Sequence, residues 1–291
     1  MNRRGFVFFL ANSLIWGVPF WLTKVLLTQF SASTIVFLRA GIAALLLVPV
    51  TWRSGALRRA IGEWRWVLVF ALAQIAIPWW LTGTAQKHLD SSFTGLLMTA
   101  IPVIGLFYAF VAKETSAFSV RGSAGLVIGI IGVFILIGLD AFETRLNVIS
   151  VLLVLLATAG FAYAPRVVAR HLQSVPSLGA VSLTMLITSA IWVVPGIHDW
   201  PKAPLRISVI FSAAVIGVIC TALAFWIFFE LIREVGPTKT TYLAFTNPMV
   251  AVAVGVIIVH EPLTLGIVCS FPLIVVGTYL AISARTRIQT A

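Results

Sequence analysis

The feature of this sequence that most constrains its fold is a series of long apolar runs that recurs along the whole chain. A transmembrane helix needs about 20 consecutive, mostly apolar residues to cross roughly 30 Å of hydrocarbon. We therefore expect an all-α integral membrane protein with ten transmembrane helices. The predicted helices span residues 5–27, 32–50, 66–86, 93–112, 122–139, 147–168, 178–196, 207–229, 240–259 and 265–283.

The composition excludes a soluble domain. Of the 291 residues, 60% are hydrophobic and 10% are charged, whereas soluble domains are about half apolar and about a quarter charged. The net charge of +11 does not indicate a nucleic-acid partner, because the Lys and Arg residues lie in short loops between apolar runs. Cys220 and Cys269 lie inside apolar runs, so no disulfide framework is expected.

The basic residues also predict the orientation. Fourteen of the 20 Lys and Arg residues fall at the chain ends or in every second loop, and four fall in the alternate loops. Positively charged loops stay on the cytoplasmic side of a membrane. Both termini are therefore predicted to be cytoplasmic, and the alternation supports the number of ten helices.

The chain resembles itself at an offset of 146 positions. Three prolines of the first half then align with prolines of the second: Pro19 with Pro165, Pro49 with Pro195, and Pro102 with Pro248. Each half holds five predicted helices, and since five is odd, the second half enters the membrane from the opposite side. We predict two inverted five-helix repeats, residues 1–145 and 146–291, around a central cavity, as in many secondary transporters.

Proline inside a helix removes a backbone donor and frees the carbonyl group four residues earlier. In lipid such a group must face protein or a water-filled cavity. A single proline is explained by a bend that improves packing. For the aligned pairs we predict a hinge or cavity role at Pro19, Pro102, Pro165 and Pro248.

Three stretches carry a family resemblance: LIWGVPFWLTK (14–24), TAIPVIGLFYAFVAKE (99–114) and FTNPMVAVAVGVIIVHEPLT (245–264). With them, the chain resembles the EamA family of the drug/metabolite transporter superfamily, and most of all its YddG-type bacterial amino-acid exporters. The resemblance implies ten helices, cytoplasmic termini, a central cavity, a bacterial inner (plasma) membrane location and export of aromatic and other amino acids.

A few polar and aromatic side chains are candidates for lining the cavity. On the first helix, one face carries Asn12, Trp16, Pro19 and Thr23. The complete predicted set is Asn12, Trp16, Pro19, Arg39, Gln74, Trp79, Trp80, Tyr163 and Asn247. For Trp16 the alternative is a place in the interfacial aromatic belt, and for Gln74 a hydrogen bond between helices. Arg39 either holds a substrate carboxylate or serves as a structural tie.

Charged residues at helix ends suggest gates. Lys24 and Glu261 fall near the predicted outer helix ends, and Arg170 and Glu114 fall at the matching inner ends. We predict that each pair tightens when its side of the protein closes. The alternative is that all four are ordinary surface charges.

The predicted function is export of aromatic and other neutral amino acids and related metabolites by alternating access. No carboxylate falls at a helix midpoint, where proton-coupled pumps commonly carry one, so we expect a gradient-driven facilitator without a cofactor. An exchanger of phosphorylated metabolites or nucleotide sugars is the main alternative, although it would need more midplane Lys and Arg. A membrane enzyme or structural subunit is a further alternative, but no catalytic or metal-binding cluster occurs. The expected partners are the solute and the lipid bilayer. The oligomeric state is left open, a monomer included.

Overall fold

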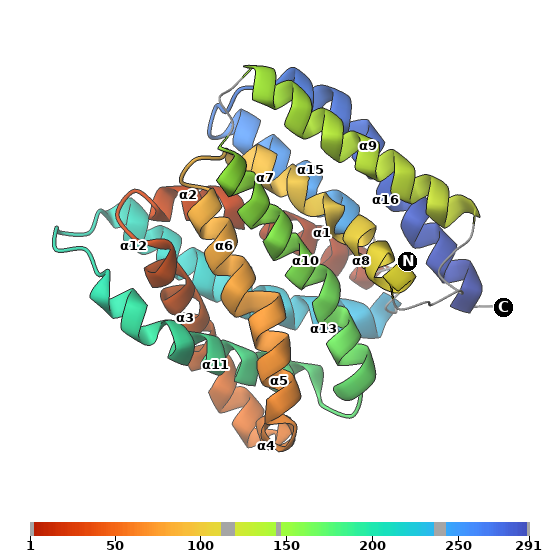
Figure 1. Cartoon of the computed structure of the whole chain (residues 1–291). Coiled ribbons are helices and arrows are strands. Elements are labelled where there is room, and N and C mark those ends of the chain that lie inside the picture. Colours follow the sequence, from red (N-terminus) through yellow and green to blue (C-terminus); the bar gives the residue numbers. More distant parts are fainter. Residues whose placement is uncertain (1–2, 112–119, 144–146, 236–242, 290–291) are drawn as a thin grey trace.

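The computed structural model describes residues 3–111, 120–143, 147–235 and 243–289, and the regular elements in these ranges are helices (Figure 1). The first half contains α1 (Arg3–Gly17), α2 (Pro19–Leu26), α3 (Ala32–Arg53), α4 (Ala56–Gly62), α5 (Trp64–Ala71), η1 (Leu72–Ala76), α6 (Ile77–Ala85), α7 (Ser91–Leu97), η2 (Met98–Ala100), α8 (Ile101–Val111) and α9 (Val120–Glu143). The second half contains α10 (Val148–His171), α11 (Ser177–His198), α12 (Ile207–Ala214), η4 (Val215–Leu223), α13 (Ala224–Val235), α15 (Leu243–Ile257) and α16 (Leu265–Gln289).

Six helical segments within the described ranges are long and apolar enough to cross a membrane: Arg3–Leu26, Ala32–Arg53, Trp64–Ala85, Val148–His171, Ser177–His198 and Ile207–Val235. Shorter apolar helical segments of 10–17 residues follow at Ser91–Gly105, Ser123–Leu139, Thr246–Ile257 and Leu265–Gly277. The structure thus shows a multi-pass helical membrane protein. The count of ten helices and the orientation of the termini stay predictions.

The outer surface of the bundle is apolar. Large hydrophobic side chains are exposed along several helices, for example Leu45 at 77%, Phe134 at 71% and Val194 at 74%. A soluble protein rarely exposes contiguous apolar surface on this scale, because it would associate. The hydrocarbon of a bilayer is the solvent that suits this surface.

The main helix contacts join the first half to the second. Helix α3 packs on α11, α7 on α15, and α9 on α16, which lie side by side in Figure 1. Helix α1 packs on α13, and α6 packs on α10. Because α1 corresponds to α10 and α13 to α6 at the offset of 146, the last two contacts are counterparts of each other. The two halves therefore interlock rather than sit apart.

Two predicted helices contain a π-helical segment that the sequence did not reveal. The helix predicted at 66–86 is interrupted by η1, and the helix predicted at 207–229 is interrupted by η4. Adding 146 to 72–76 gives 218–222, which lies inside η4, so both halves carry the interruption at the same place. A π-turn adds a residue to the helix and is frequent at functional sites.

Helices α9 and α16 approach each other through glycine. A Cβ atom at Gly277 would lie 2.5 Å from the backbone nitrogen of Gly129 and 2.7 Å from the carbonyl oxygen of Gly125. The two backbones are thus in direct contact, as is common where small residues join membrane helices.

We expect Gly277→Ala to lower the free energy of unfolding by about 1–3 kcal/mol, because its methyl group would force the two backbones apart. Thermal unfolding of the purified protein in detergent would measure the loss. Gly138→Ala on α9 is the control, since a Cβ atom there has no neighbour within 4 Å. Equal melting temperatures for the two variants would contradict this account of the contact.

Candidate functional site

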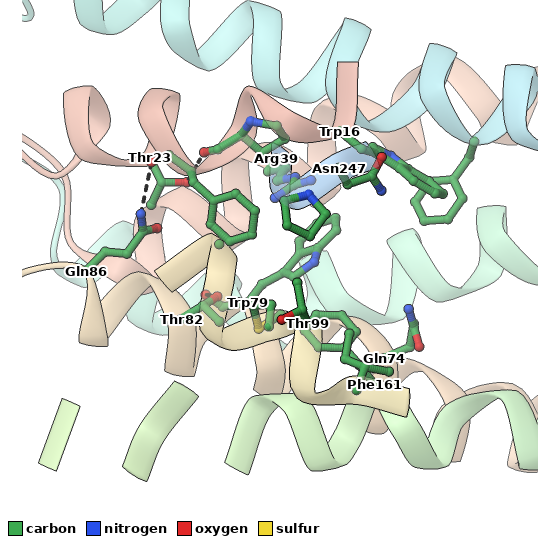
Figure 2. A pocket seen from close by; sticks show the side chains of 17 residues that line it. Trp16, Thr23, Arg39, Gln74, Trp79, Thr82, Gln86, Thr99, Phe161 and Asn247 are labelled. Carbon is green, nitrogen blue, oxygen red and sulfur yellow. Dashed lines mark hydrogen bonds between the residues drawn. The ribbon is translucent and has the colours of Figure 1, made fainter. Parts of the chain in front are cut away.

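A cavity of about 290 Å³ lies among helices of both halves (Figure 2). This is close to the lower end of the roughly 300–1,000 Å³ typical of small-molecule sites. Among the described residues, its lining is aromatic and apolar, with a few polar groups and one charge. These residues are Trp16, Pro19, Phe20, Thr23, Arg39, Gln74, Trp79, Thr82, Gln86, Gly95, Met98, Thr99, Ile101, Phe161, Phe225, Asn247 and Pro248.

One wall is a cluster of aromatic rings between the first and second halves. The ring of Trp16 in α1 lies 5.6 Å from the ring of Phe225 and 4.9 Å from that of Phe228, both in α13. Phe161 of α10 also lines the cavity. Aromatic pairs at these separations add to the stabilisation from burial, so these ring contacts help to hold α1 against α13.

The break in the first helix borders this cavity. Helix α1 ends at Gly17, and α2 begins at Pro19, which is buried and lines the cavity. The hydroxyl of Thr23 donates to the carbonyl oxygen of Pro19 at 2.7 Å. A Cβ atom at Gly17 would lie 2.3 Å from the side chain of Val250 in α15. The break therefore faces protein and cavity rather than lipid, as a membrane helix requires.

The other three predicted hinge prolines occupy different settings. Pro165 lies inside α10, is exposed and does not line the cavity, whereas Pro248 lies inside α15, is buried and lines it. Pro102 is the second residue of α8, directly after the 3₁₀ turn η2. A hinge role for any of them stays a prediction.

Arg39 of α3 is the one charged residue among the described residues that line the cavity. Its guanidinium carbon lies 3.6 Å from the ring centroid of Trp79, and its Nε donates to the hydroxyl of Thr221 in η4 at 2.8 Å. That hydroxyl in turn donates to the carbonyl oxygen of Ile216, five residues earlier. The stack and the hydrogen bond fix the plane of the guanidinium group, and no carboxylate of the described residues forms an ion pair with it.

The remaining polar groups differ in what they bind. Gln86 donates to the carbonyl oxygen of Phe20 at 3.0 Å, and Thr82 donates to that of Pro78 at 2.8 Å. Oδ1 of Asn247 is buried and has no hydrogen-bond partner among the described residues. A buried oxygen of this kind is normally satisfied, so Asn247 offers an acceptor to water or to a bound solute.

Six of the nine predicted cavity residues line this cavity: Trp16, Pro19, Arg39, Gln74, Trp79 and Asn247. Whether they bind the solute stays a prediction.

Three predicted cavity residues do not line the cavity. Asn12 is fully buried and donates to the carbonyl oxygen of Ala224 at 2.9 Å, which ties α1 to α13. Trp80 points away from the cavity, because consecutive residues of a helix point to different sides and Trp79 lines the cavity. Its ring stacks on that of Trp192 at 5.5 Å. Tyr163 is 43% exposed.

Other lining residues were not predicted from the sequence. Thr82 and Gln86 lie three and seven residues after Trp79, and this helical spacing would have placed them on the same face. Met98 and Thr99 lie in η2, and nothing in the sequence marked that 3₁₀ turn.

The predicted ion pair between Lys24 and Glu261 is not formed in this structure. Nζ of Lys24 lies 3.9 Å from Oδ1 of Asp90 instead. The carboxylate of Glu261 accepts hydrogen bonds from Ser91 and Ser92, because α7 begins between the two predicted partners and presents its free N–H groups. Of the second predicted pair, Arg170 lies in the last turn of α10, and Glu114 lies outside the described residues.

These features together define a multi-pass membrane protein with a solute-sized cavity between two interlocked halves. The EamA-like transporter family matches twice, at residues 3–138 and 148–283, and the chain belongs to this family. The match confirms the resemblance to EamA transporters. The predicted domain boundary after residue 145 falls between the two matches and stays a prediction.

Two further proteins are similar over nearly the whole chain. The uncharacterized transporter YvbV of Bacillus subtilis (strain 168) is 26% identical over 96% of this chain and 91% of its own length. A crystal structure of a protein at 17% identity has a TM-score of 0.68 and covers 99% of this chain and 100% of its own. The second likeness shows the fold alone.

We expect Thr221→Val to lower the free energy of unfolding by about 1.5–3 kcal/mol, because Nε of Arg39 would lose its acceptor in a buried setting. Thermal unfolding in detergent would measure the change. Thr28→Val is the control, since that exposed hydroxyl bonds only to the nearby carbonyl oxygen of Val25. If the two variants melt together, Thr221 does not hold Arg39.

Proposed function

We propose that this EamA-family transporter exports neutral amino acids, aromatic ones included, across a bacterial inner membrane as a gradient-driven facilitator. The observation that carries the proposal is Arg39, a single cation held flat on Trp79 in an aromatic cavity. Arginine binds carboxylates through parallel N–H donors, and here its Nε alone is engaged by Thr221.

The other lining groups suit the rest of an amino acid. The unpartnered Oδ1 of Asn247 is an acceptor for an ammonium group. The rings of Trp16 and Phe225 provide an apolar surface for a side chain and a face that attracts a cation. The cavity volume limits the solute to a small molecule.

The cavity is less suited to the alternative solutes. Phosphorylated metabolites and nucleotide sugars carry several negative charges and call for a cluster of basic residues, whereas the described lining holds Arg39 alone. Cationic drugs call for a carboxylate, and none of the described lining residues carries one. The charge of the described lining therefore favours a solute with one carboxylate.

The same lining supports facilitated rather than proton-driven transport. None of the described lining residues is Asp, Glu or His, and proton-coupled transporters use such groups as relays within the membrane. Net movement would then follow the solute gradient, outward when the solute accumulates inside.

Alternating access is supported by the relation between the halves. The contact of α1 with α13 has its counterpart in the contact of α10 with α6, and both halves carry a π-helical interruption at the same place. Two halves related in this way as inverted repeats could exchange conformations around a fixed site.

Efflux from proteoliposomes loaded with a mixture of labelled amino acids, without a pH or sodium gradient, tests the proposal. We expect selective loss of neutral and aromatic amino acids. Trp16→Ala should slow this efflux about tenfold, because it removes both ring contacts and apolar area from the cavity wall. Trp64→Ala is the matched control, since Trp64 is 52% exposed and outside the cavity.

Efflux that appears only when a pH gradient is imposed would overturn the facilitator mechanism. Absence of amino-acid movement under both conditions would overturn the substrate class. Equal effects of the two tryptophan variants would remove the assignment of Trp16 to the solute path.

A further inference from the structure

A buried carboxylate joins the two halves at one end of the cavity. Glu261, in the loop between α15 and α16, accepts hydrogen bonds from the backbone N–H groups of Ser91 and Ser92 at 2.8 Å and 2.9 Å. The hydroxyl groups of both serines also donate to it. We call these three residues the outer latch.

The outer latch favours the ionised form of Glu261. Glu261 is 8% exposed, and this burial by itself would raise the pKa of its carboxyl group. The hydrogen bonds from both serines outweigh burial and lower the pKa below its ordinary value. The free N–H groups at the start of α7 thus bind a charge supplied by the other half of the chain.

The packing around the latch leaves no room for an added side-chain atom. A Cβ atom at Gly255 of α15 would lie 2.4 Å from Oε2 of Glu261 and 3.0 Å from Cβ of Ser92. One turn further along each helix, a Cβ atom at Gly95 would lie 2.7 Å from that of Ala251. The latch therefore closes a seam along which α7 and α15 are in close contact.

This seam adjoins the cavity near one end of the molecule, since Gly95 of α7 also lines the cavity. Helix α7 leads into η2, whose Met98 and Thr99 line the cavity, and α15 contributes Asn247. At the same end Lys24 approaches Asp90, and Gln86, the residue directly after α6, donates to the carbonyl oxygen of Phe20 in α2. In Figure 1, the end of α6 and the start of α7 lie at this end of the bundle, and α4 lies at the other end. The distribution of Lys and Arg predicts that this end faces outward.

We propose that the outer latch is the extracellular gate of this protein. While it is formed, it holds α7 against α15 and closes the cavity to the outside, and it must break before the cavity opens outward. The direction of release rests on the proposed function, but the gate itself can be tested without any solute.

Protonation of Asp90 and protonation of Glu261 are expected to have opposite effects on closure of the gate. Asp90 is half-exposed, and burial, followed by the nearby charge of Glu261, raises its pKa against the opposing effect of Lys24. An ionised Asp90 thus weakens the closed gate, so its protonation stabilises closure as the pH falls through its raised pKa. Glu261 acts in the opposite sense, since its contribution to closure is lost as the pH falls through its lowered pKa. The other titratable groups of the two loops, Lys87, His88 and His260, are exposed.

Labelling of a single cysteine from the outside tests the gate. Thr82→Cys places a thiol in the cavity wall, after Cys220→Ala and Cys269→Ser remove the natural thiols. A small, charged methanethiosulfonate added to spheroplasts then reports opening. We expect Glu261→Gln to speed labelling by about tenfold or more, because it loses the charge-assisted hydrogen bonds. Asp90→Asn should slow it.

Two further variants keep the test decisive. Gly255→Ala should also speed labelling, because its methyl group displaces the carboxylate without changing a charge. Glu230→Gln is the control, since Glu230 binds Arg233 near the end of α13, away from the latch. Unchanged labelling in both Glu261→Gln and Gly255→Ala would overturn the gate. Faster labelling without amino-acid efflux would support the gate and overturn the proposed solute.

Discussion

The need to satisfy every backbone polar group inside a bilayer governs the architecture of this protein. Regular helices meet that need by themselves, and irregular backbone is tolerated only against protein or a water-filled cavity. The chain leaves the regular α-helix after Gly17 and at η1, η2 and η4. Residues at or beside these places line the cavity or hold Arg39 in position. The cavity thus occupies the part of the membrane where the helices are least regular.

Much of the fold was accessible from the sequence because it follows from one-dimensional patterns. Apolar length gave the helical segments, and the helical spacing of Trp16 and Pro19 placed both on the cavity. The resemblance of the quoted stretches to EamA transporters was confirmed by matches in both halves. Such patterns are local, so a single sequence carries them without knowledge of the partner helices.

What the sequence did not predict depends on how helices rotate and meet. Trp79 lines the cavity, whereas its neighbour Trp80 packs on Trp192, and only the position of the facing helices decides between them. The π-helical segments have no compositional signature. Lys24 pairs with Asp90 rather than Glu261 because of where α7 begins, a long-range effect invisible to charge counting.

The two halves have a common helical framework, but the charged residue of the cavity has no equivalent at the matching position. At the offset of 146 residues, Arg39 corresponds to Met185 and Thr221 corresponds to Ile75, both of which are fully buried apolar residues. The arginine and the hydroxyl that holds it therefore have no counterpart across the repeat. The two matches of one family model fit a duplicated framework, within which Arg39 and Thr221 belong to one half of the pattern only.

Except at Gly95, which lines the cavity and also meets Ala251 of α15, the close glycine contacts described above lie apart from the cavity wall. At Gly17, Gly255 and Gly277 even a methyl group meets a neighbour at less than 3 Å, and none of the three lines the cavity. Wall residues such as Phe161 and Met98 can vary without touching these contacts. The lining of the cavity can therefore change through its wall side chains while the close contacts at these three glycines stay as they are.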